Sequence, residues 1–156
     1  AQMYKGKADW TLISKVKNNP RMTIPVFGNG DVDSPEKARI MRDEYGLDGA
    51  MIGRASIGNP WFFKEVKKYL ETGVLSQGPR LEERIATAKR HLEMSIKWKG
   101  ERLGLLETRR HYSTYFRGII NFKPFRTRLV TGETITDVMD VFSELEERSE
   151  MFEATV

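Results

Sequence analysis

The chain has 156 residues, of which 39% are hydrophobic and 31% charged, and its formal net charge is +4. The absence of cysteine excludes disulfides, cysteine-bound zinc and a thiol nucleophile within these residues. No apolar run approaches the roughly 18 residues of a membrane helix, and the first residues lack the pattern of a signal peptide. We therefore expect a cytoplasmic protein with no membrane association.

The first 72 residues alternate between helix and strand patterns. Helical periodicity predicts an amphipathic helix over about 8–18, and short apolar runs predict buried strands over 24–27 and 49–53. Further helices are predicted over 35–46 and 61–70. This alternation is typical of an α/β fold with a parallel sheet. Because two strands are too few to close a core and parallel strands are normally covered on both faces, we expect missing strands upstream of Ala1.

The stretch after the first strand allows two interpretations. Asn29-Gly30 is a strong hairpin-turn signal. However, Ser34 is a good helix N-cap and Pro35 suits the first helical position. Only three residues separate Gly30 from Ser34, so a return strand does not fit. The sequence therefore favours a strand, a loop and then a helix.

A linker and an all-helical part follow. Residues 73–79 are rich in Gly, Ser and Pro, which marks a boundary. Helices are predicted over 81–99, around 112–119, near 123–129 and over 134–149, with Gly100 and Gly104 expected to end the first. These helices suggest a small bundle over 80–156. The charge is segregated: residues 80–128 hold 13 Lys and Arg against 5 Asp and Glu, whereas residues 129–156 hold 1 against 8.

Both predicted strands end in a glycine-containing loop that opens a helix. Such loops bring free N–H groups and a helix dipole toward an anion, and an arginine such as Arg54 can grip phosphate. In a (β/α)₈ barrel, the loops after the last two strands commonly form a phosphate site. Alternatively, Gly30 and Gly53 are structural, Asp31 is a turn residue, and Arg54 pairs with a surface carboxylate.

The basic segment alternates cations with aromatic residues. Arg110 and Arg117 are predicted opposite the buried aromatic face of one helix, and Arg90 and Lys97 opposite the Leu92 face of another. Such a stripe attracts nucleic-acid phosphates without sequence preference. The alternative is a solvated helix face partly neutralised by the acidic end. Two histidines 20 residues apart, without clustered carboxylates, predict no metal site.

Three stretches resemble the bacterial tRNA-dihydrouridine synthase family: 1–10 (AQMYKGKADW), 24–31 (IPVFGNGD) and 51–61 (MIGRASIGNPW). In the second half, 109–112 (RRHY) is similar to a basic motif of the family's helical domain. The resemblance implies the C-terminal part of a TIM (β/α)₈ barrel over 1–72, then a tRNA-binding helical bundle over 80–156. It implies an oxidoreductase in which NADPH reduces FMN and FMN reduces the C5–C6 bond of a tRNA uridine.

The resemblance also assigns residues. It implies that FMN binds at Asn29, Gly30, Asp31, Gly53 and Arg54. Together with the basic stripe, it gives a set of tRNA-binding residues: Arg90, Lys97, Arg109, Arg110, His111, Arg117, Lys123 and Arg126. The family's catalytic cysteine belongs to earlier strands, so no catalytic residue is expected here and the isolated chain should be inactive. The alternatives are a non-catalytic RNA-binding module and a different flavin or phosphate-ligand barrel.

Overall fold

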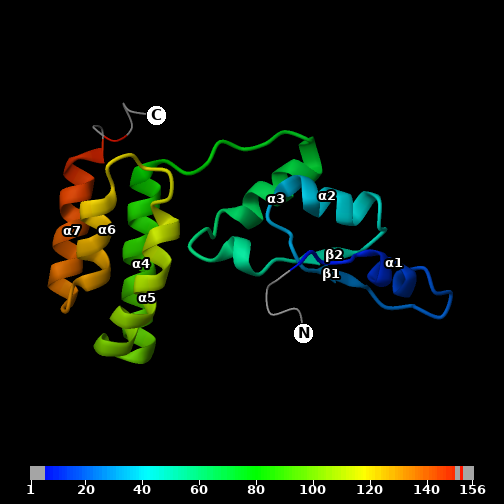
Figure 1. The fold of residues 1–156 in the computed structure, drawn as a ribbon, viewed down its shortest axis with the longest axis horizontal. Coiled ribbons are helices and arrows are strands. Elements are labelled where there is room, and N and C mark those ends of the chain that lie inside the picture. Colours follow the sequence, from blue (N-terminus) through cyan, green and yellow to red (C-terminus); the bar gives the residue numbers. More distant parts are fainter. Residues whose placement is uncertain (1–5, 150–151, 153–156) are drawn as a thin grey trace. The chain divides into compact units, whose positions relative to one another are not determined.

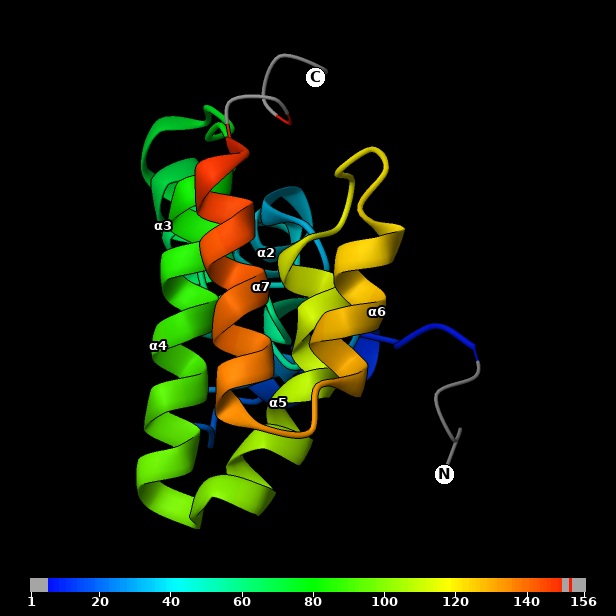
Figure 2. The ribbon, with the colours of Figure 1, turned by 90° about the vertical axis from the view of Figure 1, so that its left-hand side faces the viewer.

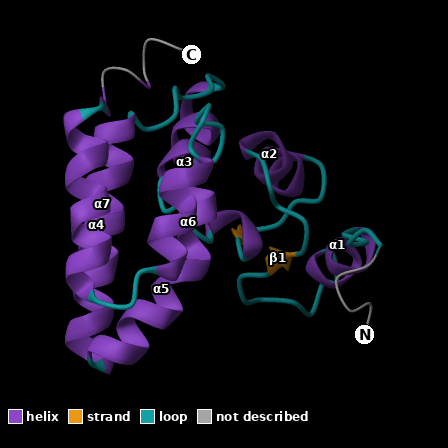
Figure 3. Cartoon of the chain, turned by 60° about the vertical axis from the view of Figure 1, so that its left-hand side comes forward, coloured by secondary structure: helices purple, strands orange, loops and turns teal. Residues whose placement is uncertain are grey.

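The computed structural model describes residues 6–149 and 152, and the chain divides into two compact units, 1–77 and 78–156 (Figure 1). Helices dominate both units, and the only regular strands in the described residues are two short ones in the first unit (Figure 3). No helix in the described part of the chain combines the length and the apolar character required to cross a bilayer.

The first unit alternates helix and strand, as the sequence predicts. Its elements are α1 (Thr11–Lys17), β1 (Phe27–Asn29), α2 (Pro35–Asp43), β2 (Gly49–Met51), a 3₁₀ turn η1 (Arg54–Ser56) and α3 (Phe62–Thr72). The two strands are parallel, and Phe27, Gly28 and Asn29 pair with Gly49, Ala50 and Met51. The predicted parallel pairing is therefore confirmed.

A core lies between the strands and the helices of this unit. Its buried members are Val32, Ala38, Met41, Leu47, Phe62 and Val66, with Trp10, Ile13, Val26 and Ala50 packed against them. α2 and α3 lie on the same side of the strand pair in Figure 1. Because residues alternate between the faces of a strand, Gly28 and Ala50 point to this core while Phe27 and Met51 point away from it.

The prediction of a buried strand over 24–27 is wrong in position and in burial. The strand begins only at Phe27, and the side chains of Ile24 and Phe27 are 66% and 64% exposed. Two local features explain the shift. Pro25 has no N–H to donate to a ladder. The N–H of Val26 donates to a side-chain oxygen of Asp48 at 2.6 Å instead of to a strand.

The choice between hairpin and helix after Asn29-Gly30 is settled in favour of the helix. The Ser34 hydroxyl accepts a hydrogen bond from the Lys37 N–H at 3.3 Å, which caps α2, and Pro35 occupies its first turn. α2 ends at Asp43, before the predicted end at Gly46. The carboxyl end of β1 is therefore followed directly by a short loop and a helix N-terminus.

The second unit consists of four helices in the described residues: α4 (Leu81–Lys99), α5 (Glu101–Tyr115), α6 (Lys123–Thr131) and α7 (Ile135–Glu147) (Figure 2). The predicted helix over 81–99 is confirmed to the residue. The four helices enclose a core that includes Ile85, Leu92, Tyr112, Leu129, Val138 and Phe142. The predicted burial of Tyr112, Tyr115 and Phe116 is also confirmed, but the helix predicted around 112–119 is wrong in its bounds, because α5 ends at Tyr115 and Arg117 lies beyond it.

The expected role of Gly104 is wrong, because this glycine lies inside α5 and ends no helix. Gly100 alone separates α4 from α5. A Cβ atom on Gly104 would lie 2.6 Å from the backbone nitrogen of Ile96 in α4. The glycine therefore permits the backbones of the two helices to approach each other closely.

Candidate functional site

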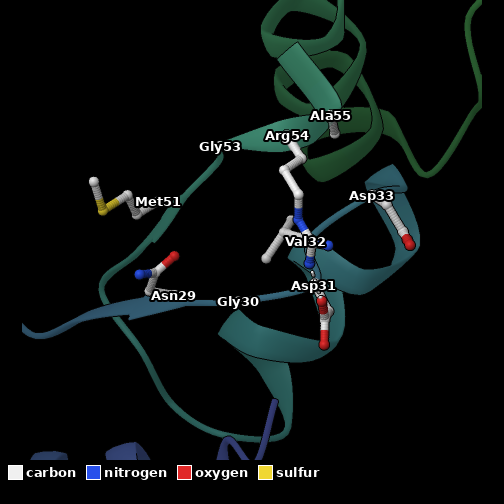
Figure 4. A pocket seen from close by; sticks show the side chains of 9 residues that line it. All are labelled: Asn29, Gly30, Asp31, Val32, Asp33, Met51, Gly53, Arg54 and Ala55. Atoms are coloured by element: carbon white, nitrogen blue, oxygen red, sulfur yellow. Dashed lines mark hydrogen bonds and ion pairs between the residues drawn. The ribbon is translucent and has the colours of Figure 1, made fainter. Parts of the chain in front are cut away.

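The loops that follow β1 and β2 meet at one edge of the parallel pair. In a parallel sheet the carboxyl ends of neighbouring strands lie at the same edge, and this arrangement brings the two loops together. They line an open concavity of about 540 Å³ (Figure 4). Its lining contains all five residues that the sequence assigns to a cofactor: Asn29, Gly30, Asp31, Gly53 and Arg54.

An ion pair joins the two loops across this concavity. The Arg54 guanidinium donates from Nη2 to Oδ1 of Asp31 at 2.6 Å, and the two side chains point toward each other in Figure 4. The Arg54 side chain is 59% exposed, whereas that of Asp31 is 28% exposed. The carboxylate therefore holds the arginine in one orientation while much of the guanidinium still faces solvent.

Asp31 also fixes the segment that precedes α1. Its second oxygen, Oδ2, accepts a hydrogen bond from the Ala8 N–H at 2.7 Å. Next to it, the Trp10 indole donates to the Gly30 carbonyl at 2.9 Å. The backbone of Gly30 and Asp31 is left-handed, with φ of 101° and 54°, and a Cβ on Gly30 would lie 2.6 Å from that of Ala8. Glycine is required at position 30 for both reasons.

Two carboxylates, Asp31 and Asp33, and one arginine, Arg54, line the concavity, and each is engaged in an ion pair. Arg54 pairs with Asp31, and Asp33 pairs with Lys37 at 2.7 Å. An anion here would therefore depend on backbone N–H groups and on the exposed part of the guanidinium, as at other helix N-termini. On the Gly53 side there is room for a ligand, because a Cβ placed on Gly53 would meet nothing within 4 Å.

The eight residues assigned to tRNA binding fall into two groups in the second unit. Six are exposed: Arg90, Lys97, Arg110, Arg117, Lys123 and Arg126. Arg109 and His111 are only partly exposed. Arg109 donates from Nη2 to the Gly132 carbonyl at 2.6 Å, which ties α5 to the segment before α7.

His111 belongs to a polar cluster between α4 and α5. Its ring lies 4.8 Å from that of His91, centroid to centroid, and Nδ1 of His91 lies 3.1 Å from the Tyr115 hydroxyl. Burial lowers the pKa of both histidines. Repulsion by Lys99 and Arg110 lowers the pKa of His91 further, and repulsion by Arg110 and by the protonated form of His91 lowers that of His111. Both imidazoles are therefore held toward the neutral form.

Sequence patterns alone do not reveal several residues of these sites. Ala8 and Trp10 hydrogen-bond to Asp31 and Gly30 from 20 or more residues away, and no local spacing signals these contacts. The contact between His91 and His111 follows from the antiparallel pairing of two adjacent helices, so it could be found only once that pairing was assumed. In residues 6–149 and 152, no three His, Asp or Glu side chains form a group that could hold a metal ion.

One protein family matches this chain along most of its length. The model of the family described as dihydrouridine synthase (Dus) matches residues 1–153. Among curated proteins, the chain is 38% identical over 128 residues to a tRNA-dihydrouridine synthase B from Pseudomonas putida. The matched stretch covers 82% of this chain and 37% of the relative. It is 42% identical over 113 residues to a tRNA-dihydrouridine synthase B from Shewanella oneidensis, which covers 72% of this chain and 34% of the relative.

A third relative extends the match along the chain. A probable tRNA-dihydrouridine synthase 1 from Synechocystis is 34% identical over 144 residues, which covers 92% of this chain and 40% of the relative. The chain thus spans between about a third and two fifths of the length of these relatives. Because the family model covers almost every residue, the chain belongs to the dihydrouridine synthase family.

Proposed function

We propose that this chain is the C-terminal part of an FMN-dependent tRNA-dihydrouridine synthase. Residues 1–72 would be the last strands of an FMN-binding TIM barrel, 73–79 a linker, and 80–156 a tRNA-binding helical bundle. The observation that carries the proposal is the meeting of two glycine loops and Arg54 at the carboxyl edge of a parallel strand pair. This is where phosphate-bearing ligands bind in such barrels. The relatives, which are named tRNA-dihydrouridine synthases, support the same reaction.

The concavity fits the phosphate end of FMN. Arg54 would donate to phosphate oxygens, and the backbone around Gly30 and Gly53 would supply N–H donors. The side-chain amide of Asn29 would add a hydrogen-bond donor at the carboxyl end of β1. Asp31 is negative and would repel a phosphate, so its proposed role is to orient Arg54 and to fix the loop through Ala8.

When bound, FMN supplies the hydride that reduces the C5–C6 double bond of a uridine, after its own reduction by NADPH. The residues of this chain would bind and orient its phosphate end. The sequence has no cysteine to donate a proton, so that group would come from the N-terminal barrel half in cis. We therefore expect the isolated chain to be inactive.

The second unit would hold tRNA through its exposed cations. Arg90, Lys97, Arg110, Arg117, Lys123 and Arg126 are the proposed phosphate contacts. Each such contact releases counterions from RNA, so binding should weaken steeply as salt rises. Arg109 and His111 would instead support this surface from within, because both are partly buried between helices.

The test is to purify, from its source cells, the polypeptide that contains this sequence. We expect bound FMN, identified by its absorbance and mass, and NADPH-dependent formation of dihydrouridine in unmodified tRNA. Replacing Arg54 with Gln should reduce FMN occupancy severalfold, since it removes a charge-assisted contact to phosphate. Arg21→Gln, which changes an exposed arginine of the same unit outside the concavity, is the matched control.

Two results would contradict the proposal. A flavin-free polypeptide that binds tRNA would favour a non-catalytic RNA-binding module. A flavin-containing polypeptide that reduces a small molecule and ignores tRNA would favour a different flavin barrel.

A further inference from the structure

The hairpin of α4 and α5 carries a large aromatic side chain with almost no cover. Trp98 is 82% exposed, more than any other large apolar side chain in the described part of the chain. Met94 and Leu103 nearby are 50% and 54% exposed. Tryptophan is highly buried on average, and gathered apolar residues on a surface mark a site of interaction. The exposed Trp98 and its apolar neighbours therefore mark a candidate interaction site.

These apolar residues share one side of the hairpin. His91, Met94 and Trp98 follow the i, i+3, i+7 spacing of a single face of α4. Leu103, Glu107 and His111 follow the i, i+4, i+8 spacing of a single face of α5. Two contacts align these rows: the rings of His91 and His111, and the ion pair of Lys99 with Glu107. We name these six residues the Trp98 face.

The bundle packs on other sides of the two helices. Lys89 pairs with Glu146 of α7 at 2.9 Å, and Lys89 lies two residues from His91, on the opposite side of α4. On α5, Tyr112 rather than the Trp98 face contacts Phe142 of α7, with ring centroids 5.7 Å apart. The Trp98 face is therefore the outer side of the second unit at this hairpin.

Positive charge borders the Trp98 face. Arg90, Lys97 and Arg110 are exposed and adjacent in sequence to members of the face, against one exposed carboxylate, Glu93, beside Met94. Its single carboxylate, Glu107, is already paired with Lys99. An exposed aromatic ring flanked by cations is typical of surfaces that bind single-stranded nucleic acid, where the ring stacks on a base and the cations hold the neighbouring phosphates. A protein partner would instead favour an apolar centre depleted of charge.

We propose that Trp98 stacks on an unpaired base of tRNA while Arg90, Lys97 and Arg110 contact the adjacent phosphates. This proposal rests on the proposed function of the second unit in tRNA binding. It specifies the part of tRNA that the unit contacts, namely a loop or an end with a base free to stack. His91 and His111, neutral between the two helices, form the polar floor of this surface.

The test compares variants of the full 156-residue chain for binding to an unmodified tRNA transcript over a range of salt concentrations. Trp98→Ala should weaken binding about tenfold, because stacking of one base on an aromatic ring contributes about 1–3 kcal/mol. It should leave the salt dependence unchanged, since no charge is lost. Trp98→Phe should retain most of the affinity. Arg110→Gln should reduce the slope of log K against log salt by about one.

Ile120→Ala is the matched control, because Ile120 is an exposed apolar residue of the same unit outside the Trp98 face. Wild-type affinity in Trp98→Ala, with a reduced slope in Arg110→Gln, would overturn the stacking proposal and leave tRNA binding intact. A wild-type chain that does not bind tRNA would overturn both. Self-association that Trp98→Ala abolishes without any change in tRNA affinity would make the face a contact between copies, and would also overturn the proposal.

Discussion

A single carboxylate organises the candidate cofactor site. Asp31 accepts from Ala8 with one oxygen and pairs with Arg54 through the other, so it ties together three segments that are distant in sequence. Its left-handed backbone, with φ of 54°, is a conformation that Asp and Asn adopt more readily than other side chains. Asp31→Asn therefore changes the charge without adding backbone strain.

We expect Asp31→Asn to lower the free energy of unfolding by about 1 kcal/mol, since it loses a partly exposed ion pair but can still accept from Ala8. Asp31→Ala should cost more, because it also removes the acceptor and leaves an unfavourable φ. Urea denaturation of the chain measures both. Asp33→Asn, which removes a more exposed pair with Lys37, is the control and should change stability by less than about 0.5 kcal/mol. Equal effects of Asp31→Asn and Asp33→Asn would show that Asp31 is an ordinary surface carboxylate.

The two histidines should make stability depend on pH. Burial lowers both pKa values from the ordinary 6.5, and Lys99 and Arg110 lower that of His91 further, as His91 and Arg110 do for His111. The folded state then binds fewer protons than the unfolded state, so their contribution to stability is complete above pH 6.5 and is lost as pH falls below it. Tyr115 and Glu107 are the other titratable groups beside them, and the carboxyl pKa of Glu107 is lowered by Lys99.

The double substitution His91→Gln and His111→Gln removes both histidines of the chain. Between about pH 7 and pH 5, the double variant should lose less unfolding free energy than the wild type does. Urea titrations at each pH measure this difference. An unchanged slope would mean that carboxylates alone account for the acid sensitivity.

That the five proposed cofactor-binding residues lie together at one edge of the strand pair could be predicted from sequence, because each part of the pattern is local. Asn29, Gly30 and Asp31 directly follow one strand, Gly53 and Arg54 follow the next, and parallel pairing brings such loops together. The pairing of Asp31 with Arg54 could not be predicted, because it depends on side-chain directions within both loops. The sequence suggested a surface carboxylate for Arg54 only as an alternative to phosphate, whereas the structure makes the carboxylate part of the same concavity.

At the scale of single helices, periodicity located α4 correctly, but it placed the next helix around 112–119, whereas α5 spans Glu101–Tyr115. The helix over 81–99 is correct because its apolar spacing is regular and Gly100 follows it. Gly104 has the same local signal as Gly100 but lies against Ile96, a contact between two helices that no local pattern encodes.

Gly104→Ala tests this contact. Alanine is the better helix former by about 1 kcal/mol, so propensity alone would stabilise α5. The added Cβ would lie 2.6 Å from the Ile96 nitrogen, and the two helices would have to separate. We expect a net loss of about 1–3 kcal/mol, as for other overpacked sites, measured by thermal or urea unfolding. Ser113→Ala, at an exposed position of the same helix, should change stability by less than about 0.5 kcal/mol. A stabilised Gly104→Ala variant would show that α4 and α5 are free to separate.

The start of α7 is defined by a reciprocal cap. The Thr134 hydroxyl accepts from the Asp137 N–H at 3.1 Å, and the Asp137 carboxylate accepts from the Thr134 N–H at 2.9 Å. Thr134→Ala should cost about 1 kcal/mol of unfolding free energy in the same assay. Thr136→Ala, two residues later and exposed, removes a hydroxyl that makes no part of the cap. If both variants lost the same stability, the cap would contribute nothing specific.

On the scale of the whole chain, each compact unit has a core of its own. The first packs Met41, Leu47 and Phe62 beside its two strands, and the second packs Leu92, Tyr112 and Phe142 among four helices. One face of the strand pair remains open, as the exposure of Phe27 and Met51 shows. Parallel strands are normally covered on both faces, so this open face is the one that further strands of the proposed barrel would cover.

The segment between the two cores should be the first site of proteolysis. Residues 73–80 belong to no helix or strand, and Val74 and Leu75 are 58% and 54% exposed. Exposed connections between separately packed cores are the preferred sites of cleavage, because a protease must bind an extended, accessible backbone. Brief digestion with chymotrypsin should therefore cut after Leu75 before it cuts at Tyr112 or Phe142, which are fully buried. Mass spectrometry of the fragments would identify the first cut. Early cleavage within α5 or α7 would mean that the helical core opens more readily than the linker, and that the second unit does not fold as the independent tRNA-binding body proposed for it.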